Sequence, residues 1–216
     1  MEQRKQIPVP AIERLCRYHR VVARARRFGP KRLSSQELAS LAAVTPEQVR
    51  KDLSYFGAFG RRGVGYDVER LSVELKRILG LGEPRLFSIL GAGNLGTALA
   101  GYAGFEARGF KLAGVYDSNA ARVGHMVQGL RVRPIDALVG DNARDPVDIA
   151  VLAVPEATAQ TAADLAVAAG IRALLNFAPV SLRVPEGFVL RDVDMTGELE
   201  YLSFWLAYMD ENGSGG

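Results

Sequence analysis

Apolar side chains recur at helical spacing through residues 11–28, on one face of a segment whose other face is rich in arginine. This pattern predicts an amphipathic helix that ends at Gly29 and Pro30. We expect the preceding Pro8-Val9-Pro10 to be extended. The side chains expected to share the core-facing side of the helix are Ile12, Leu15, Cys16, His19 and Val22.

Two shorter helices separated by a tight turn are predicted next. Ser34 and Glu37 have the spacing of a capping box at the first helix, and Thr45 precedes Pro46 as the N-cap of the second. A helix, a short turn and a second helix of polar and basic character indicate a helix-turn-helix motif. The side chains of the second helix that are expected to face inward are Val49 and Leu53.

Glycines flank arginines and aromatic residues over 56–66, which predicts a hairpin that completes a winged helix. The tip of this wing carries Arg61 and Arg62, which are expected to touch phosphates or to enter a minor groove. Another amphipathic helix is predicted over 71–79, followed by a linker over 80–84.

Beyond the linker, short apolar runs typical of buried strands alternate with helical segments. The runs cover 86–90, 111–117, 126–132, 147–153, 171–177 and 188–193. This alternation predicts a doubly wound parallel sheet, which is the Rossmann architecture. The last segment, 195–209, is more apolar than one helix on one sheet requires, so we expect a dimerisation helix rather than packing within the chain.

The predicted fold class is therefore α/β, with an N-terminal winged helix-turn-helix domain and a C-terminal Rossmann domain that ends in a dimerisation helix. The predicted boundaries are 1–80 for the DNA-binding domain, 81–194 for the Rossmann domain, and 195–216 for the C-terminal helix and tail.

Charge is divided unevenly between these parts. Residues 1–80 hold 17 Lys and Arg against 8 Asp and Glu, whereas 81–216 hold 10 against 16. A basic part joined to an acidic one indicates that the basic part, residues 1–80, binds a polyanion. The single cysteine, Cys16, excludes an internal disulfide, and no apolar run reaches the ~18 residues of a membrane span. We expect no signal peptide, no membrane partner and a cytoplasmic location.

A glycine loop, Gly91-Ala92-Gly93-Asn94-Leu95-Gly96, lies between the first predicted strand of the Rossmann part and the next helix. In a G-x-G-x-x-G loop, the first glycine permits a tight turn, and the second lets the backbone approach a pyrophosphate. The third lets the helix pack closely on the strand. The N–H groups at the helix start face the phosphates. This context predicts a dinucleotide site.

An acid, Asp117, ends the next strand 21 positions after Gly96. A carboxylate at this place accepts hydrogen bonds from the adenosine ribose and would repel a 2′-phosphate. The sequence therefore favours NAD(H) over NADP(H), unless the nearby Arg122 reorganises the site.

No catalytic set accompanies this dinucleotide site in the sequence. His125 lies just past the second strand rather than at the late strand ends, and Tyr102 has no lysine four residues on. Neither a Ser/His/Asp order nor a zinc pattern is present. A dinucleotide site without catalytic groups, joined to a DNA-binding domain, indicates a sensor rather than an enzyme. We predict no catalytic residue and no metal site.

The residues predicted to contact double-stranded DNA lie on the helix-turn-helix and the wing. Arg and Gln side chains suit base edges, whereas Lys and Ser contact mostly phosphates. The predicted set is Ser35, Thr45, Gln48, Arg50, Lys51, Ser54, Tyr55, Arg61 and Arg62.

Several stretches together resemble one family, the redox-sensing transcriptional repressor Rex. They are 48–57 (QVRKDLSYFG), 62–66 (RGVGY), the glycine loop, 176–179 (NFAP) and 193–194 (VD), and the resemblance spans residues 8–208. It implies a homodimer with winged-helix heads and Rossmann domains, which binds operator DNA when NADH is scarce and releases it when NADH rises. In the family the C-terminal helix is swapped onto the partner subunit, and the residue after Asp194, here Met195, reaches towards the partner's nicotinamide.

A mechanism follows as a hypothesis. The nicotinamide is neutral in NADH and cationic in NAD⁺, so a closed apolar pocket disfavours the oxidised form. The candidates to line this pocket are Tyr102, Val154, Phe177 and Met195. The full set predicted to bind NADH or NAD⁺ is Gly91, Ala92, Gly93, Asn94, Leu95, Gly96, Tyr102, Asp117, Val154, Pro155, Asn176, Phe177, Asp194 and Met195.

Two other functions stay open on the sequence. One is an NAD-dependent oxidoreductase with a helical appendage, which requires a catalytic donor that the residues do not reveal. The other is a protein-interaction adaptor whose Rossmann fold binds CoA or a nucleotide as a structural ligand. Failure to bind duplex DNA at low salt would favour the adaptor.

Overall fold

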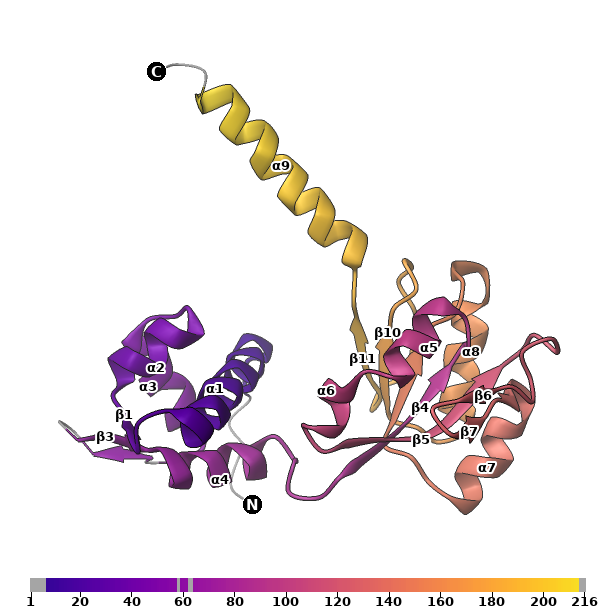
Figure 1. Cartoon of the computed structure of the whole chain (residues 1–216), viewed down its shortest axis with the longest axis horizontal. Coiled ribbons are helices and arrows are strands. Elements are labelled where there is room, and N and C mark those ends of the chain that lie inside the picture. The colour runs from indigo at the N-terminus through magenta and orange to yellow at the C-terminus, as the bar shows by residue number, and fades with distance from the viewer. Residues whose placement is uncertain (1–6, 58, 62–63, 214–216) are drawn as a thin grey trace. The chain divides into compact units, whose positions relative to one another are not determined.

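The computed structural model describes residues 7–57, 59–61 and 64–213, and the chain divides into two compact units, Met1–Glu83 and Pro84–Gly216 (Figure 1). The predicted linker, 80–84, spans this division. The helices of the first unit are α1 (Val9–Phe28), α2 (Ser35–Ala42), α3 (Pro46–Ser54) and α4 (Val68–Ile78). Its strands β1 (Arg32–Leu33), β3 (Gly65–Asp67) and β2 (Gly60–Arg61) pair in that order as an antiparallel sheet. This arrangement confirms the predicted winged helix-turn-helix.

Side-chain caps begin both helices of the helix-turn-helix, as predicted. The Ser34 hydroxyl accepts a hydrogen bond from the Glu37 N–H at 3.1 Å, and the Glu37 carboxylate accepts one from the Ser34 N–H at 2.7 Å. The Thr45 hydroxyl accepts the Gln48 N–H at 3.2 Å. Between the two helices, Ala43 adopts a left-handed conformation (φ 53°), which makes the turn tight.

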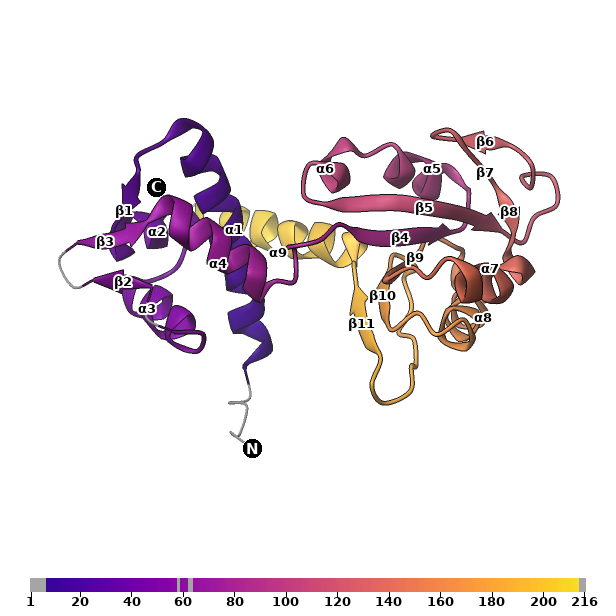
Figure 2. The same cartoon turned by 90° about the horizontal axis from the view of Figure 1, so that it is seen from below.

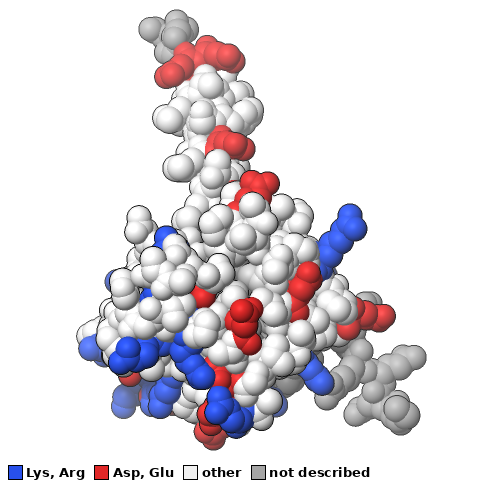
Figure 3. All heavy atoms as spheres, turned by 90° about the vertical axis from the view of Figure 1, so that its right-hand side faces the viewer, with Lys and Arg blue, Asp and Glu red and all other residues white. Residues whose placement is uncertain are grey.

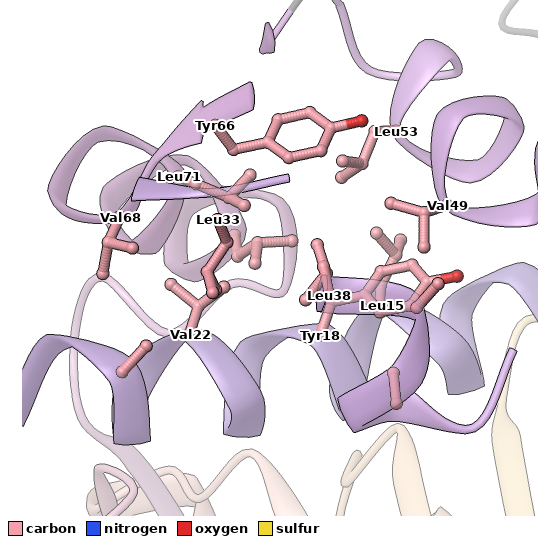
Figure 4. Close-up of a cluster of buried hydrophobic side chains, with 14 residues drawn as sticks. Leu15, Tyr18, Val22, Leu33, Leu38, Val49, Leu53, Tyr66, Val68 and Leu71 are labelled. Atoms are coloured by element: carbon pink, nitrogen blue, oxygen red, sulfur yellow. The ribbon is translucent and has the colours of Figure 1, made fainter. Parts of the chain in front are cut away.

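The core of the first unit gathers apolar side chains from α1, α2, α3, α4 and the sheet (Figure 4). Val49 and Leu53 of α3 are buried in it, as predicted, and so is His19. The predicted face of α1 is partly wrong, because Ile12 and Cys16 are exposed while Tyr18 is fully buried. The buried residues of α1 are Ala11, Leu15, Tyr18, His19, Val22 and Ala25.

The buried face differs from the predicted one because the Tyr18 hydroxyl has a buried hydrogen-bond partner, so the whole ring can enter the core. The start of α1 was also predicted too late. Helix α1 begins at Val9 and includes Pro10 in its first turn, where the missing N–H has no intrahelical partner to lose.

The second unit contains a six-stranded parallel sheet in the order β11-β10-β9-β4-β5-β8. Its strands are β4 (Arg85–Leu90), β5 (Phe110–Asp117), β8 (Arg133–Pro134), β9 (Ile149–Leu152), β10 (Ala173–Asn176) and β11 (Val189–Asp192). The chain builds outward from β4 to β8, returns to the centre at β9, and then builds outward to β11. This is the doubly wound order of the Rossmann fold, with its switch point between β4 and β9.

Helices cover both faces of this sheet (Figure 2). They are α5 (Asn94–Ala100) and α6 (Ala103–Glu106) on one face, and α7 (Leu138–Arg144), after the short 3₁₀ helix η1 (Ile135–Ala137), and α8 (Glu156–Ala168) on the other. Phe87 and Ile89 of β4 pack with α5 and α6, whereas Leu90 packs with α7 and α8. The period-two alternation along β4 therefore matches a strand that is buried on both sides.

The strand predicted over 126–132 is wrong in part. Residues Met126–Val127 (β6) and Leu130–Arg131 (β7) form an antiparallel hairpin, and only Arg133–Pro134 (β8) joins the main sheet. Gln128 (φ 48°) and Gly129 (φ 77°) cause the difference, because two successive left-handed residues make a tight hairpin turn.

Helix α9 (Met195–Gly213) presents its apolar side chains to solvent in the single chain. Leu199, Phe204 and Leu206 each expose more than 60% of their surface, and Trp205 exposes 41%. The charged side chains visible on it in Figure 3 are acidic. Its sequence holds Glu198, Glu200, Asp210 and Glu211 and no lysine or arginine. None of the helices formed by described residues is long and apolar enough to cross a membrane.

Candidate nucleotide and nucleic-acid sites

The glycine loop lies at the carboxyl end of β4, beside the switch point of the sheet. Ligands of open parallel sheets bind in the crevice at such a point, because the chains leave the sheet there in opposite directions. The N–H of Gly91 donates to the carbonyl of Tyr116 on β5 at 2.7 Å, and the N–H of Ala153 donates to the carbonyl of Leu90 at 2.8 Å. Both neighbouring strands therefore hold the loop in place.

Each of the three glycines in the loop has a different steric environment. Gly91 has φ 105°, and a Cβ there would collide with the carbonyl oxygen of Ala153. A Cβ on Gly96 would collide with the carbonyl oxygen of Gly91, so α5 and β4 can approach only without it. A Cβ on Gly93 would meet nothing closer than the Arg122 guanidinium at 3.9 Å, so no atom crowds this side of the backbone. These surroundings fit a pyrophosphate at Gly93.

Asp117 is buried at the end of β5, with 4% of its surface exposed, and its carboxylate is fixed by three donors. Oδ2 accepts the Ala92 N–H at 2.7 Å and Nη1 of Arg122 at 3.3 Å, and Oδ1 accepts the Asn119 N–H at 2.7 Å. The predicted ribose-binding acid is thus bonded directly to the glycine loop. The spacing in the sequence could not show this bond, which joins residues 25 positions apart.

The residues predicted for the nicotinamide side lie at the carboxyl ends of β9 and β10 or on exposed positions. Val154 and Phe177 are half-buried, and Pro155 is exposed. Phe177 follows β10 directly, and Val154 lies two residues past the end of β9. Phe177 packs with the apolar side chains of the α5–α6 face. Tyr102 and Met195 are each about half exposed, with 53% and 52% of their surfaces accessible.

Asn176 and Asp194, both predicted to bind the cofactor, make hydrogen bonds within the chain. The Asn176 side chain is fully buried, and its Nδ2 donates to Asp192 Oδ1 at 2.8 Å and to the carbonyls of Ala178 and Val180 at 3.1 and 2.9 Å. These hydrogen bonds fix the shape of the 176–180 loop. The Asp194 carboxylate accepts the Gly197 N–H at 2.8 Å at the start of α9.

The surface of α3 presents most of the side chains predicted to contact DNA. Arg50, Lys51 and Ser54 are exposed, and Tyr55 is half-buried at the end of the helix. Nη2 of Arg50 lies 2.5 Å from the Glu47 carboxylate, which leaves most of the guanidinium donors free. Ser54 donates to the carbonyl of Lys51 at 2.7 Å.

A groove of about 960 Å³ separates α2 and α3 from the β2–β3 hairpin. Ser35 on α2 and both Arg50 and Ser54 on α3 line it, together with Arg32 of β1. Arg61 belongs to strand β2, and Arg62 lies outside the described residues. Thr45 is occupied as the cap of α3.

A buried carboxylate that the sequence pattern did not single out holds α3 to α1. Asp52 is fully buried and accepts Arg14 Nε at 2.6 Å, Arg14 Nη2 at 2.9 Å, Tyr18 Oη at 2.8 Å and Gln48 Nε2 at 2.8 Å. Gln48, predicted to face DNA, is therefore half-buried with its amide directed at Asp52. The sequence does contain a signal for this network, which is the i,i+4 spacing of two pairs, Arg14 with Tyr18 and Gln48 with Asp52.

This network keeps Asp52 ionised. Burial raises the pKa of the Asp52 carboxyl, but the hydrogen bonds from Arg14, Tyr18 and Gln48 outweigh burial and lower the pKa below its ordinary value. Burial and the hydrogen bond to Asp52 raise the pKa of the Tyr18 hydroxyl, which stays protonated as a donor.

Comparison with known proteins identifies the family. A redox-sensing transcriptional repressor Rex of Desulforamulus reducens is 43% identical over 206 residues, which cover 95% of this chain and 98% of the relative. A second Rex, from Thermus thermophilus, is 46% identical over 199 residues, or 92% and 93% of the two chains. The chain belongs to the Rex family. Two family models match parts of it, "CoA binding domain" over 86–180 and "Putative DNA-binding protein N-terminus" over 6–54.

Solved structures of a Rex-family repressor named RSP have the same fold. RSP in complex with β-NAD⁺ and operator DNA is 38% identical, with a TM-score of 0.89 over 98% of this chain and 100% of RSP. RSP in complex with β-NADH is 37% identical, with a TM-score of 0.86 over 96% and 98% of the chains. Within the described ranges, this chain gathers no three His, Cys, Asp or Glu side chains that could hold a metal ion.

Proposed function

We propose that this chain is a redox-sensing transcriptional repressor that binds operator DNA as a homodimer and releases it when NADH binds at the glycine loop. One observation carries the proposal: a single chain combines a glycine cradle beside Asp117 with a winged helix-turn-helix whose second helix exposes Arg50 and Lys51. The RSP structures support it, because one contains β-NADH and another contains β-NAD⁺ with operator DNA. A repressor acts where the genome is, which supports a cytoplasmic location.

The relatives disfavour both other functions. They are named repressors, not oxidoreductases, and they match this chain across both units, which an adaptor built only on the nucleotide-binding fold does not require. The chemistry of the site agrees with binding rather than turnover. His125, the histidine nearest to the site in sequence, is exposed and lies beyond β5.

Residues at the carboxyl ends of β9 and β10 account for a response to redox state. The cofactor, when bound, supplies a nicotinamide ring that is neutral when reduced and cationic when oxidised. Val154 and Phe177 offer this ring an apolar wall, and an apolar wall disfavours a cation that loses its hydration. Tyr102 and Met195 are accessible and complete the wall when the subunits close. Asp117 and the glycine loop bind the shared adenosine and pyrophosphate, so they supply affinity without discrimination.

Helix α9 supplies the dimer contact. Its apolar side chains are exposed in the single chain, which is typical of a surface that a partner covers. The α5–α6 face of the sheet has an apolar groove of about 280 Å³, lined by side chains that include Phe105, Val151, Leu175 and Val189. In this proposal α9 of each subunit packs on the partner, as the family resemblance implies. Two winged helices then meet two half-sites of a symmetric operator.

The decisive experiment measures operator binding by fluorescence anisotropy, with a pseudo-palindromic duplex selected from random sequence. At fixed salt, NADH is expected to release the duplex at concentrations where NAD⁺ does not. Release by both cofactors would refute discrimination at the nicotinamide. Binding that is indifferent to both would leave the Rossmann unit as a scaffold, and no sequence-specific binding would refute the repressor.

Arg50 and Lys51 are expected to differ in what they recognise. Arg50→Ala should relax the sequence preference at one position of each half-site and cost ~1–3 kcal/mol there, because arginine pairs with base edges. Lys51→Ala should weaken all sequences alike and reduce the salt slope by about 1, because a phosphate contact releases a counterion. Competition against single-base operator variants at several salt concentrations separates the two.

Arg70→Ala is the matched control, because it removes one positive charge from α4 at an exposed residue that does not line the groove. It should change neither the sequence preference nor the salt slope. If Arg50→Ala weakens every operator variant equally, Arg50 is a phosphate contact and not a base contact.

A further inference from the structure

Arg122 lies against the nucleotide site, although the dinucleotide pattern does not include it. Its Nη1 and Nη2 atoms are both 3.9 Å from the place where a Cβ of Gly93 would stand, and Nη1 is 3.3 Å from Asp117 Oδ2. The guanidinium therefore contacts the carboxylate predicted for the ribose and lies near the side of Gly93 predicted for the pyrophosphate.

The loop after β5 is built to return Arg122 to this place. The Asn119 N–H donates to Asp117 Oδ1 at 2.7 Å, and the Ala121 N–H donates to Asn119 Oδ1 at 2.9 Å. The Arg122 N–H then donates to the Asn119 carbonyl at 2.9 Å. Two successive side-chain turns thus wind residues 117–122 tightly, so Arg122 starts from a fixed backbone position.

The two members of the pair differ in burial and in the number of hydrogen bonds that hold them. The Asp117 side chain is 5% exposed and has three donors, whereas the Arg122 side chain is 46% exposed and holds the carboxylate at the long distance of 3.3 Å. A guanidinium has five N–H groups, so donors of Arg122 remain for a ligand. The carboxylate is thus the fixed partner, and the cation can turn towards a phosphate.

This juxtaposition has a chemical consequence for the adenosine ribose. A 2′-phosphate would stand within reach of the guanidinium, which binds phosphate through paired hydrogen bonds. The same phosphate would meet the negative charge of Asp117, which does not move. Whether the site accepts a phosphorylated ribose therefore depends on the charge at residue 117, because the cation is already in place.

We propose that Arg122 is a phosphate-binding residue of the nucleotide site that Asp117 restricts to NAD(H), so that neutralising Asp117 alone makes the site accept NADP(H). The proposal rests on the proposed function, because it assumes that the glycine loop binds a dinucleotide.

The test is direct binding of NADH and NADPH to the full chain, followed by the fluorescence of the reduced nicotinamide. The wild-type protein should prefer NADH. Asp117→Ser should lose ~10-fold in NADH affinity and gain ~10–100-fold in NADPH affinity, since hydrogen bonds to charged groups contribute ~1.5–3 kcal/mol. Adding Arg122→Ala to Asp117→Ser should remove the NADPH gain. Arg172→Ala, which removes an exposed arginine at the amino end of β10, away from the carboxyl ends of the strands, should leave the gain intact.

Asp117→Asn is the second variant, for use if the serine variant unfolds because it has lost the bond to the Ala92 N–H. The amide oxygen of asparagine can still accept this hydrogen bond. A gain of NADPH binding that persists without Arg122, or no gain in either folded variant, overturns the proposal. These outcomes differ from a failure of the proposed function, which would be shown by wild-type protein that binds NADH but stays bound to its operator. A wild-type protein that binds neither dinucleotide overturns both.

Discussion

Gly96→Ala should abolish the response to NADH while leaving operator binding in place. The added Cβ would collide with the carbonyl oxygen of Gly91, so α5 must move away from β4 and the loop loses its shape. We expect NADH affinity to fall by ~100-fold or more, which corresponds to ~2.7 kcal/mol. Operator affinity should stay within about 2-fold, because the DNA-binding residues lie in the other unit. The variant would therefore repress at all NADH concentrations in the anisotropy assay.

Two alanine variants distinguish a loss of ligand binding from a loss of folding stability. Gly140→Ala lies inside α7, where an added Cβ has nothing within 4 Å, so it should keep full NADH affinity and equal or higher stability. Gly93→Ala should leave the melting temperature unchanged and still weaken NADH, because its Cβ occupies the space for the pyrophosphate. Normal NADH binding by Gly96→Ala would show that the nucleotide binds elsewhere.

Asp52→Ala should destabilise the DNA-binding unit by ~3–5 kcal/mol, which is the usual cost of removing one partner from a buried ion pair. The substitution leaves the Arg14 guanidinium, the Tyr18 hydroxyl and the Gln48 amide without their shared acceptor. Since Asp52 joins α3 to α1, operator affinity should fall together with stability. Urea unfolding of the full chain and operator titration measure the two effects.

Glu69→Ala is the matched control, because it also removes a carboxylate from an arginine pair within the same unit. The Arg26–Glu69 pair is exposed, with 50% and 65% of the side chains accessible, so its loss should cost ~0–1 kcal/mol. Equal losses of stability for Glu69→Ala and Asp52→Ala would contradict a special role for the buried carboxylate.

The same network predicts a pH dependence with a defined sign. The pKa of Asp52 is lowered on folding, so its contribution is complete above the unfolded value of ~3.9 and is lost as pH falls towards the folded value. Wild-type stability should therefore drop below about pH 4, and Asp52→Asn should remove this part of the drop. Unfolding curves of both proteins between neutral and acidic pH measure the difference.

Local patterns in the sequence were sufficient for the elements and their order. The helical period of α3, the alternation of β4 and the cap at Ser34 depend on neighbours within a few residues, which the sequence displays directly. The pattern failed where two adjacent residues changed the local conformation. At Gln128 and Gly129, two left-handed residues turned an apolar stretch into a hairpin.

The sequence by itself determined the winged helix-turn-helix, the Rossmann sheet, the glycine loop and the acid at Asp117, because each follows from residue type and spacing along the chain. The tertiary structure alone decided which polar atoms meet. Asp52 accepts hydrogen bonds from residues 34 and 38 positions away, and Asp117 accepts one from residue 92. Hydrogen-bond partners depend on how distant elements pack, and a local pattern carries no record of that packing.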